Sequence, residues 1–428
     1  MKKTYKALLC GAAAVAAVGI AYAMDERFFE KAKDKLTVFK CRANSKIMEQ
    51  ALPLTDAMFP GPKVVSGADS AKKIPEVLKE LNVNKVMIVT GPTVGRTIVP
   101  PIAENLERHG IGYTIYDQVE ANPSVKTVEA IRAQYLENGC DGFLAIGGGS
   151  PMDAAKAAAA RVAKPNTPIG KMAGLMKVMI KVAPIVAVPT TSGTGSEVTM
   201  GAVISDHDER HKYAIMDPNL VPKYAVLDPK LTVSMPKFVT ATTGIDALTH
   251  AVESYVTWAY NNNASNRNAE EAVVKIFRNL KRAYEDGNDL EAREAMLIAS
   301  YKAGLAFNHT GVGYVHAIAH AMGGIYNTAH GLANAVIMPI VLEDYGTAVH
   351  PQLAHLAEIT GVKTTGSDAE KANAFIAENR LSPRKLIEQS KVETLCTTDD
   401  IIDTLEYHKK IKEDKSFKTR VLPSFRTD

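Results

Sequence analysis

The feature that most constrains the fold is a change in hydrophobic period near Met235. Before it, short apolar runs alternate with helical stretches; beyond Pro236, helical spacing dominates and β-branched runs nearly vanish. The apolar runs show no polar alternation, which is typical of parallel strands buried on both faces. We therefore expect an open, mostly parallel α/β domain followed by an all-helical domain. The expected strands are Lys85–Thr90, Tyr113–Tyr116, Phe143–Ile146, Pro184–Val188 and Tyr224–Leu227, with crossover helices at Ile74–Leu81 and Val99–His109.

Length and composition agree with a two-domain globular enzyme. At 428 residues the chain exceeds the size, about 250 to 300 residues, at which one core stops growing. The 50 basic and 47 acidic residues give a net charge of +3, so nothing points to a nucleic-acid partner. Cys10, Cys41, Cys140 and Cys396 are scattered and form no disulfide or zinc framework.

Residues 1–23 have the three parts of a secretory signal: Lys2-Lys3, an apolar stretch from Leu8 to Ile20, and Ala21-Tyr22-Ala23. The alternative is an uncleaved helix that attaches an internal enzyme to a membrane, since this apolar stretch is too short to span about 30 Å of hydrocarbon. Residues 24–59 are predicted to form a helical extension. We expect a cytoplasmic protein, membrane-associated at most, without excluding export.

A first candidate phosphate-binding turn follows the strand at Phe143–Ile146. Gly147, Gly148 and Gly149 would let backbone N–H groups approach an anion at the start of a helix. Ser150 is expected to cap that helix, and Asp153 to complete a capping box.

A second turn, Pro189–Glu197, follows the strand at Pro184–Val188 and holds Thr190, Thr191 and Thr194. Open α/β sheets bind ligands at the carboxyl ends of their strands, so two such turns favour a nucleotide site. Neither turn matches G-x-G-x-x-G or a P-loop, so the site would be a variant.

Histidines and one aspartate indicate a divalent metal site in the helical half. Asp246 and His250 stand at i and i+4 on one helix face, and His316 and His320 repeat that spacing. A straight helix would place His330 about 21 Å from His316, so we expect a break between them. The spacing leaves open which of His316 and His320 is the ligand. The glycines and polar residues of 323–328 would supply the break.

Three imidazoles and one carboxylate suit Fe²⁺ or Zn²⁺ and would leave a net positive charge to polarise an alcohol oxygen. His309 is expected in a loop rather than among the ligands.

These motifs, in this order, resemble those of the iron-containing (group III) alcohol dehydrogenases. The resemblance runs from about Pro60 to Leu356 and is carried by 147–153, 189–197, 244–251, His-Ala-x-Ala-His at 316–320 and His-Gly-x-Ala-Asn at 330–334. It implies an NAD(P)-binding α/β domain over 60–235 and an all-helical metal-binding domain over 236–428, an architecture like that of dehydroquinate synthase.

The resemblance also implies roles for individual residues. The metal ligands would be Asp246, His250, His316 and His330, with His320 as a catalytic proton relay. An alcohol polarised by the ion would transfer hydride to NAD(P), and the reverse reaction would reduce an aldehyde. The expected cofactor-binding residues are Gly91, Gly147, Gly148, Gly149, Ser150, Asp153, Thr190, Thr191, Thr194 and Lys212.

The chain departs from the family pattern at Gly91, where NAD-specific members commonly carry an aspartate. A 2′-phosphate would not be repelled there, so we hypothesise that NADP(H) is accepted and even preferred. The tail from about Lys391 also lacks the usual helical pattern. Met200-Gly201 and Phe307 suggest a pocket for a short primary alcohol or diol, and the family resemblance suggests a homo-oligomer.

Three other interpretations remain open at this stage. One is a polyol (glycerol-type) dehydrogenase or a dehydroquinate synthase-like lyase of the same fold. A second is a metallohydrolase that uses Asp246 and His250 and binds no nicotinamide. A third is a non-catalytic nucleotide-binding or assembly protein, in which metal removal would change only stability.

Overall fold

The computed structural model describes residues 61–206, 211–257, 261–326, 328–379, 394–399 and 420–425. The expectations for 1–23 and 24–59 lie outside these residues. The chain divides into two compact units, Met1–Gly331 and Leu332–Asp428. Every residue assigned above to the metal or cofactor site belongs to the first unit.

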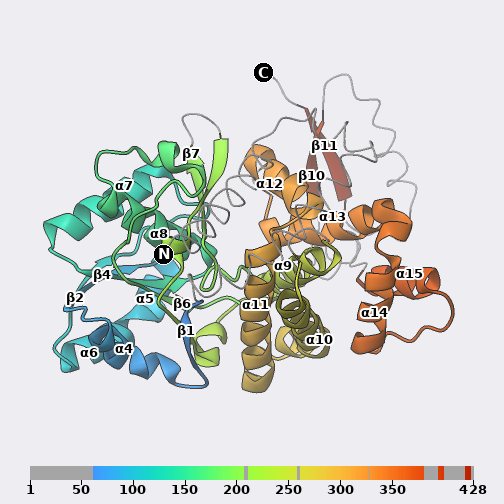
Figure 1. Ribbon diagram of the computed structural model, residues 1–428, viewed down its shortest axis with the longest axis horizontal. Helices are drawn as coiled ribbons and strands as arrows, with labels where there is room; N and C mark the ends of the chain where they lie inside the picture. The colour runs from blue at the N-terminus through green and yellow to red at the C-terminus, as the bar shows by residue number, and fades with distance from the viewer. Residues whose placement is uncertain are drawn as a thin grey trace, which may run out of the picture. The chain divides into compact units, whose positions relative to one another are not determined.

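A six-stranded sheet in the order β1-β9-β6-β4-β2-β3 forms the framework of the first unit (Figure 1). Each neighbouring pair is parallel, which confirms the predicted α/β class. The sequence predicted five of these strands and missed the short edge strand β1. The strands are β1 Lys63–Ser66, β2 Lys85–Val89, β3 Gly112–Tyr116, β4 Gly142–Gly147, β6 Ile185–Pro189 and β9 Tyr224–Leu227.

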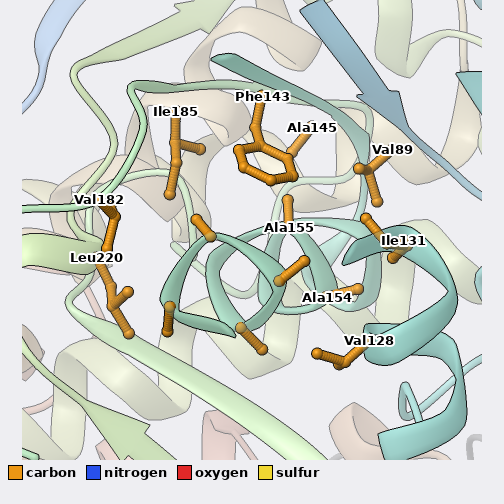
Figure 2. Packing of buried hydrophobic residues seen from close by; sticks show 14 of the residues in the cluster. Val89, Val128, Ile131, Phe143, Ala145, Ala154, Ala155, Val182, Ile185 and Leu220 are labelled. Atoms are coloured by element: carbon orange, nitrogen blue, oxygen red, sulfur yellow. The ribbon is translucent and has the colours of Figure 1, made fainter. Parts of the chain in front are cut away.

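Helices cover both faces of the sheet, so its central strands contribute to two cores. On β4, Phe143 and Ala145 belong to one cluster and Leu144 and Ile146 to the other. Figure 2 shows the first cluster, where Phe143 lies among side chains of α8, α7 and neighbouring strands. Complete burial of such a side chain contributes about 1.5 to 3 kcal/mol. The helices are α4 Ile74–Glu80, α5 Pro92–Thr97, α6 Val99–Arg108, α7 Val125–Glu137 and α8 Gly149–Ala163.

The strand order reverses direction between β2 and β4, because β3 lies on one side of β2 and β4 on the other. Ligands of open α/β sheets bind at such a switch point, beyond the carboxyl ends of the strands.

A separate three-stranded sheet, β5-β8-β7, contains an antiparallel hairpin that the sequence did not predict. Its strands are β5 Gly174–Leu175, β7 Gly201–Asp206 and β8 His211–Met216, and the single-turn helices of this half are η1 Ser70–Lys73, η2 Ile169–Met172, η3 Pro218–Leu220 and η4 Pro229–Thr232.

After Pro236 the first unit continues as helices, as predicted. They are α9 Lys237–Val256, α10 Asn263–Glu285, α11 Leu290–Thr310 and α12 Tyr314–Tyr326, and α9, α10 and α11 pack on one another. Asn262 caps α10, with a reciprocal bond from its backbone N–H to Ser265 Oγ. The loop prediction for His309 is wrong, because α11 continues to Thr310 and ends only at Gly311, whose φ is 73°.

The second unit is mostly helical. α13 (His330–Tyr345) begins at the last residues of the first unit and is followed by η5 Gly346–Ala348, α14 His350–Thr360 and α15 Asp368–Asn379. The described part of the tail also holds a parallel pair, β10 Thr394–Asp399 and β11 Arg420–Phe425, which helical patterning did not predict. Among the described residues, no single helix meets the length and hydropathy needed to cross a membrane; only α13–η5 with α14, bent by 120°, passes as a pair.

Candidate metal and cofactor site

Helix α9 supplies three ionisable side chains to one buried site. Asp246, His250 and Glu253 stand at i, i+4 and i+7, which are neighbouring positions on one helix face. All three are at least 94% buried, with exposures of 3%, 6% and 2%. Burial of this many ionisable groups is costly unless they are paired or bind a cation.

His316 of α12 completes a compact group with two of them. Asp246, His250 and His316 each offer a ligand atom within 4.8 Å of the others. His316 Nε2 lies 3.6 Å from Asp246 Oδ1, and its ring stacks on that of His250 with centroids 4.3 Å apart. Of the two histidines between which the i, i+4 spacing could not choose, His316 is the one whose ligand atom lies close to those of Asp246 and His250.

Glu253 fixes the orientation of the His316 ring. His316 Nδ1 lies 2.5 Å from Glu253 Oε2, and Glu253 Oε1 accepts the Val315 backbone N–H at 2.8 Å. With a proton held at Nδ1 by the carboxylate, Nε2, which faces Asp246, is the atom that would bind a metal. Sequence reasoning missed Glu253, although its position three residues after His250 on the same face was a usable signal.

The predicted break before His330 is present. α12 ends at Tyr326 and α13 begins at His330, which brings His330 Nε2 to 3.5 Å from Asp246 Oδ1. Gly331 allows this approach, because a Cβ there would lie 2.0 Å from the Thr242 backbone oxygen. His330 lies beside the triad without belonging to the group of mutually close ligand atoms.

His320 lies beside the triad rather than within it. Its ring centroid is 6.4 Å from that of His316 and 4.9 Å from that of His330. Burial lowers the pKa of His320 to about 4, and the nearby His330, His316 and Lys212 act in the same direction. His320 is therefore a neutral imidazole at pH 7.

The electrostatics of the triad suit a cation. Burial alone would raise the pKa of Asp246, but His250, His330 and His316 together hold it well below its usual range. Burial lowers the pKa of His250 to about 3, against the opposing effect of Asp246. Although burial opposes it, hydrogen bonds to Asp246 and Glu253 raise the pKa of His316 to about 9.

The environment and chemistry of these donor atoms also fit a bound metal ion. The Nδ1 atom of His250 is buried and makes no hydrogen bond of good geometry among the described residues, although the Gly193 backbone lies beside the ring. Phe307 stacks on the other side of the His250 ring, with centroids 4.3 Å apart, and excludes water there. Imidazole with carboxylate matches Fe²⁺ or Zn²⁺.

The two glycine-rich turns lie against each other at the end of β4 and β6. Gly147 has φ 151°, and its carbonyl accepts the Thr190 N–H at 2.9 Å. A Cβ at Gly148 would lie 3.2 Å from Thr191 Oγ1, and one at Gly149 only 2.9 Å from Thr194 Cγ2. These glycines are thus needed for close packing of the two turns.

The predicted capping box is wrong. Helix α8 starts at Gly149 with Gly148 as its N-cap and has no side-chain cap. Ser150 instead accepts the Asn122 backbone N–H at 3.2 Å, and Asp153 accepts from Ser196 Oγ at 2.8 Å and Val203 N–H at 3.0 Å. These longer-range partners outcompete local capping, which leaves the helix N–H groups available to an anion.

Two further predicted cofactor residues, Lys212 and Gly91, lie on β8 and at the start of α5. Lys212 Nζ donates to Asn122 Oδ1 at 2.9 Å, which links β8 to the residue that Ser150 accepts from. Gly91 is the N-cap of α5 directly beyond β2. A Cβ at Gly91 would lie 3.2 Å from the Val119 backbone oxygen, so a larger residue has little room.

Comparison with known proteins identifies the class to which this fold and site belong. Residues 61–229 match the model described as "Iron-containing alcohol dehydrogenase", and residues 240–392 match "Fe-containing alcohol dehydrogenase family, C-terminal". NAD-dependent methanol dehydrogenase of Bacillus methanolicus is 35% identical over 330 residues, 76% of this chain and 86% of that protein. Lactaldehyde reductase of Escherichia coli K12 is 33% identical over 317 residues, 73% and 81% of the two chains.

A solved structure of 1,3-propanediol oxidoreductase superposes with a TM-score of 0.73 at 34% identity, covering 77% of this chain and 86% of the other. The chain belongs to the iron-containing alcohol dehydrogenase family. It is an NAD(P)-dependent oxidoreductase that interconverts alcohols and aldehydes, which rules out the metallohydrolase and non-catalytic interpretations.

Proposed function

We propose that the enzyme interconverts a short primary alcohol or diol with its aldehyde, using a divalent metal held by Asp246, His250, His316 and His330. The observation that carries this proposal is the buried triad of Asp246, His250 and His316, with its ligand atoms within 4.8 Å of one another. When bound, the ion supplies positive charge that polarises the alcohol or aldehyde oxygen. Fe²⁺ is the proposed metal, with Zn²⁺ as the alternative.

The protein's own residues orient a metal ligand, transfer the proton and line the substrate pocket. Glu253 keeps the His316 ring in the ligand orientation through a 2.5 Å contact. His320, neutral and next to His330, is proposed to accept the proton released during alcohol oxidation and to return it in the reverse reaction. Phe307, which stacks on His250, supports an apolar pocket for a short substrate.

We propose that residues 60–235 bind the dinucleotide and that the domain beginning at 236 supplies the metal ligands. The uncapped start of α8 and the closely packed turns at 147–149 and 190–194 support a diphosphate site there. Gly91, Ser150, Asp153 and Lys212 border it. Asp153 would act through Ser196 and Val203, because both of its oxygens are already hydrogen-bonded.

We further propose that NADP(H) is accepted as well as NAD(H) and can be preferred. Gly91 provides no carboxylate beyond β2 to repel a 2′-phosphate. Steady-state kinetics with NADH and NADPH tests this proposal; strict use of NADH would contradict it.

The function itself is tested by anaerobic NAD(P)H oxidation with a panel of short aldehydes, using enzyme stripped of metal and then supplied with Fe²⁺ or Zn²⁺. We expect activity only with metal, and highest for small apolar aldehydes. Metal-independent turnover, or full turnover by Asp246→Ala, would overturn the proposal. A glycerol-type substrate would instead support the polyol dehydrogenase alternative. Homo-oligomerisation and membrane association stay predictions of the sequence.

A further inference from the structure

Lys156 is a buried cation that the proposed chemistry does not use. It lies on α8, two turns beyond Gly149, and its exposure is 0%. Its Nζ contacts three backbone carbonyls, those of Ser196 at 2.6 Å, Thr199 at 2.8 Å and Gly201 at 2.9 Å. An ammonium group has three N–H donors, so these carbonyls can satisfy it completely.

Burial and the nearby carboxyl groups have opposite effects on the pKa of this amine. Burial lowers the pKa of Lys156 to about 8, while Asp153 and Glu197 act to raise it. Burial of an ammonium group is costly unless it is paired and fully hydrogen-bonded, as it is here. Its partners lie in the segment 196–201, which is irregular up to Met200 and ends at Gly201, the first residue of β7.

Asp153, one turn before Lys156, holds the same segment from the same helix. Asp153 Oδ1 accepts from Ser196 Oγ at 2.8 Å and Oδ2 accepts the Val203 N–H at 3.0 Å. Lys156 also approaches Ser196 Oγ at 3.0 Å. Asp153, Lys156 and Ser196 therefore form one hydrogen-bonded cluster, which we call the loop clamp.

The opposite side of the segment rests on α11. Gly195 has φ 61°, and a Cβ on it would lie 2.7 Å from the Cα of Gly304. Met200 N–H donates to Asn308 Oδ1 at 3.0 Å. The segment is thus fixed between α8 and α11, and neither anchor is local in sequence.

The clamped segment continues directly from the second glycine-rich turn. Thr191 and Thr194 of that turn pack on Gly148 and Gly149. Gly193 packs on Thr243 of α9, where a Cβ on Gly193 would lie 2.6 Å from Thr243 Cβ, and its backbone also faces His250. Displacement of this turn would therefore disturb its packing on Gly148 and Gly149, where the dinucleotide is proposed to bind.

We propose that Lys156 is a positioning residue for the dinucleotide, acting through the loop clamp to hold the turn 190–194 against the start of α8. It touches neither cofactor nor metal and works through three carbonyls. The inference rests on the proposed placement of the dinucleotide between these two turns.

The test compares Lys156→Met with Lys164→Met in metal-loaded enzyme. Lys164, at the end of the same helix, donates to a single carbonyl, that of Lys177 at 2.8 Å, and serves as the matched control. We expect Lys156→Met to raise the Kd for NADH and the KM for NAD(H) by roughly tenfold, the equivalent of about one charge-assisted hydrogen bond. Bound metal should stay stoichiometric, and Lys164→Met should leave Kd unchanged.

A purely structural role would lower the unfolding temperature of Lys156→Met without changing the Kd of the folded protein, and that result would overturn the inference. If Lys156→Met does not fold, Ser196→Ala is the second variant, because it removes one hydroxyl group of the loop clamp. We expect it to raise the Kd for NADH about threefold, and an unchanged Kd would also overturn the inference. Wild-type enzyme that binds neither NADH nor NADPH would overturn the proposed function, and this inference with it.

Discussion

Replacement of Glu253 by glutamine tests whether a carboxylate behind His316 controls metal affinity. Glu253 accepts two N–H groups, His316 Nδ1–H with one oxygen and the Val315 backbone with the other. A glutamine amide has only one acceptor oxygen, so its NH₂ group would face one of these donors. If the NH₂ group faces His316, relief comes when the proton of His316 moves to Nε2, which removes the lone pair that a metal needs.

The magnitude follows from this geometry. Loss of an outer carboxylate partner of a metal-bound histidine typically weakens metal binding about 10- to 100-fold, or about 1.4 to 2.7 kcal/mol. Because Glu253 is only 2% exposed, water cannot readily take over as acceptor. We therefore expect the upper half of that range for Glu253→Gln.

The measurement is a titration of metal-free enzyme with Zn²⁺ or anaerobic Fe²⁺ against a chelator of known affinity. Glu270→Gln is the matched control, because Glu270 accepts a hydrogen bond from Tyr255 on the neighbouring helix, outside the triad. At saturating metal, Glu253→Gln should regain much of its kcat. Metal affinity equal to that of wild type would refute the reasoning.

Three further predictions concern the site and its supports. Gly331→Ala would place a Cβ 2.0 Å from the Thr242 oxygen. We therefore expect the free energy of unfolding in denaturant to fall by about 1 to 3 kcal/mol, and the metal content to fall because His330 is displaced. Wild-type values for both would contradict this prediction. Burial raises the pKa of Glu197 from 4.5 to about 7, so the folded state holds a proton that the unfolded state releases, and stability falls as pH rises from 4.5 to 7. Between pH 5 and 8, Glu197→Gln should remove up to about 3 kcal/mol of this loss in the free energy of unfolding. An unchanged pH dependence would count against the reasoning. His320→Gln should lower kcat about 10²-fold with metal content unchanged, whereas loss of metal would make it a ligand instead.

The sequence predicted those features that depend on residues close together along the chain. Buried strands such as Phe143–Ile146 were predictable because a short apolar run bounded by glycine is typical of a strand in the core. The hairpin β7–β8 was missed, since it forms a sheet of its own outside the parallel sheet, with β7 packed on α8. The capping role of Ser150 failed because Asn122, which is 28 residues away, supplies a competing donor.

By itself the sequence determined the family, the parallel α/β half, the candidate aspartate and histidines of the metal site, and the need for a chain break between His316 and His330. These follow from periodicity and from i, i+4 spacing, which fix geometry within one helix. Only the tertiary structure decided that His316 rather than His320 joins Asp246, that Glu253 stands behind it, and that Lys156 binds the segment 196–201. Each of these depends on how separate helices pack, and spacing along the chain carries no information about distances between them.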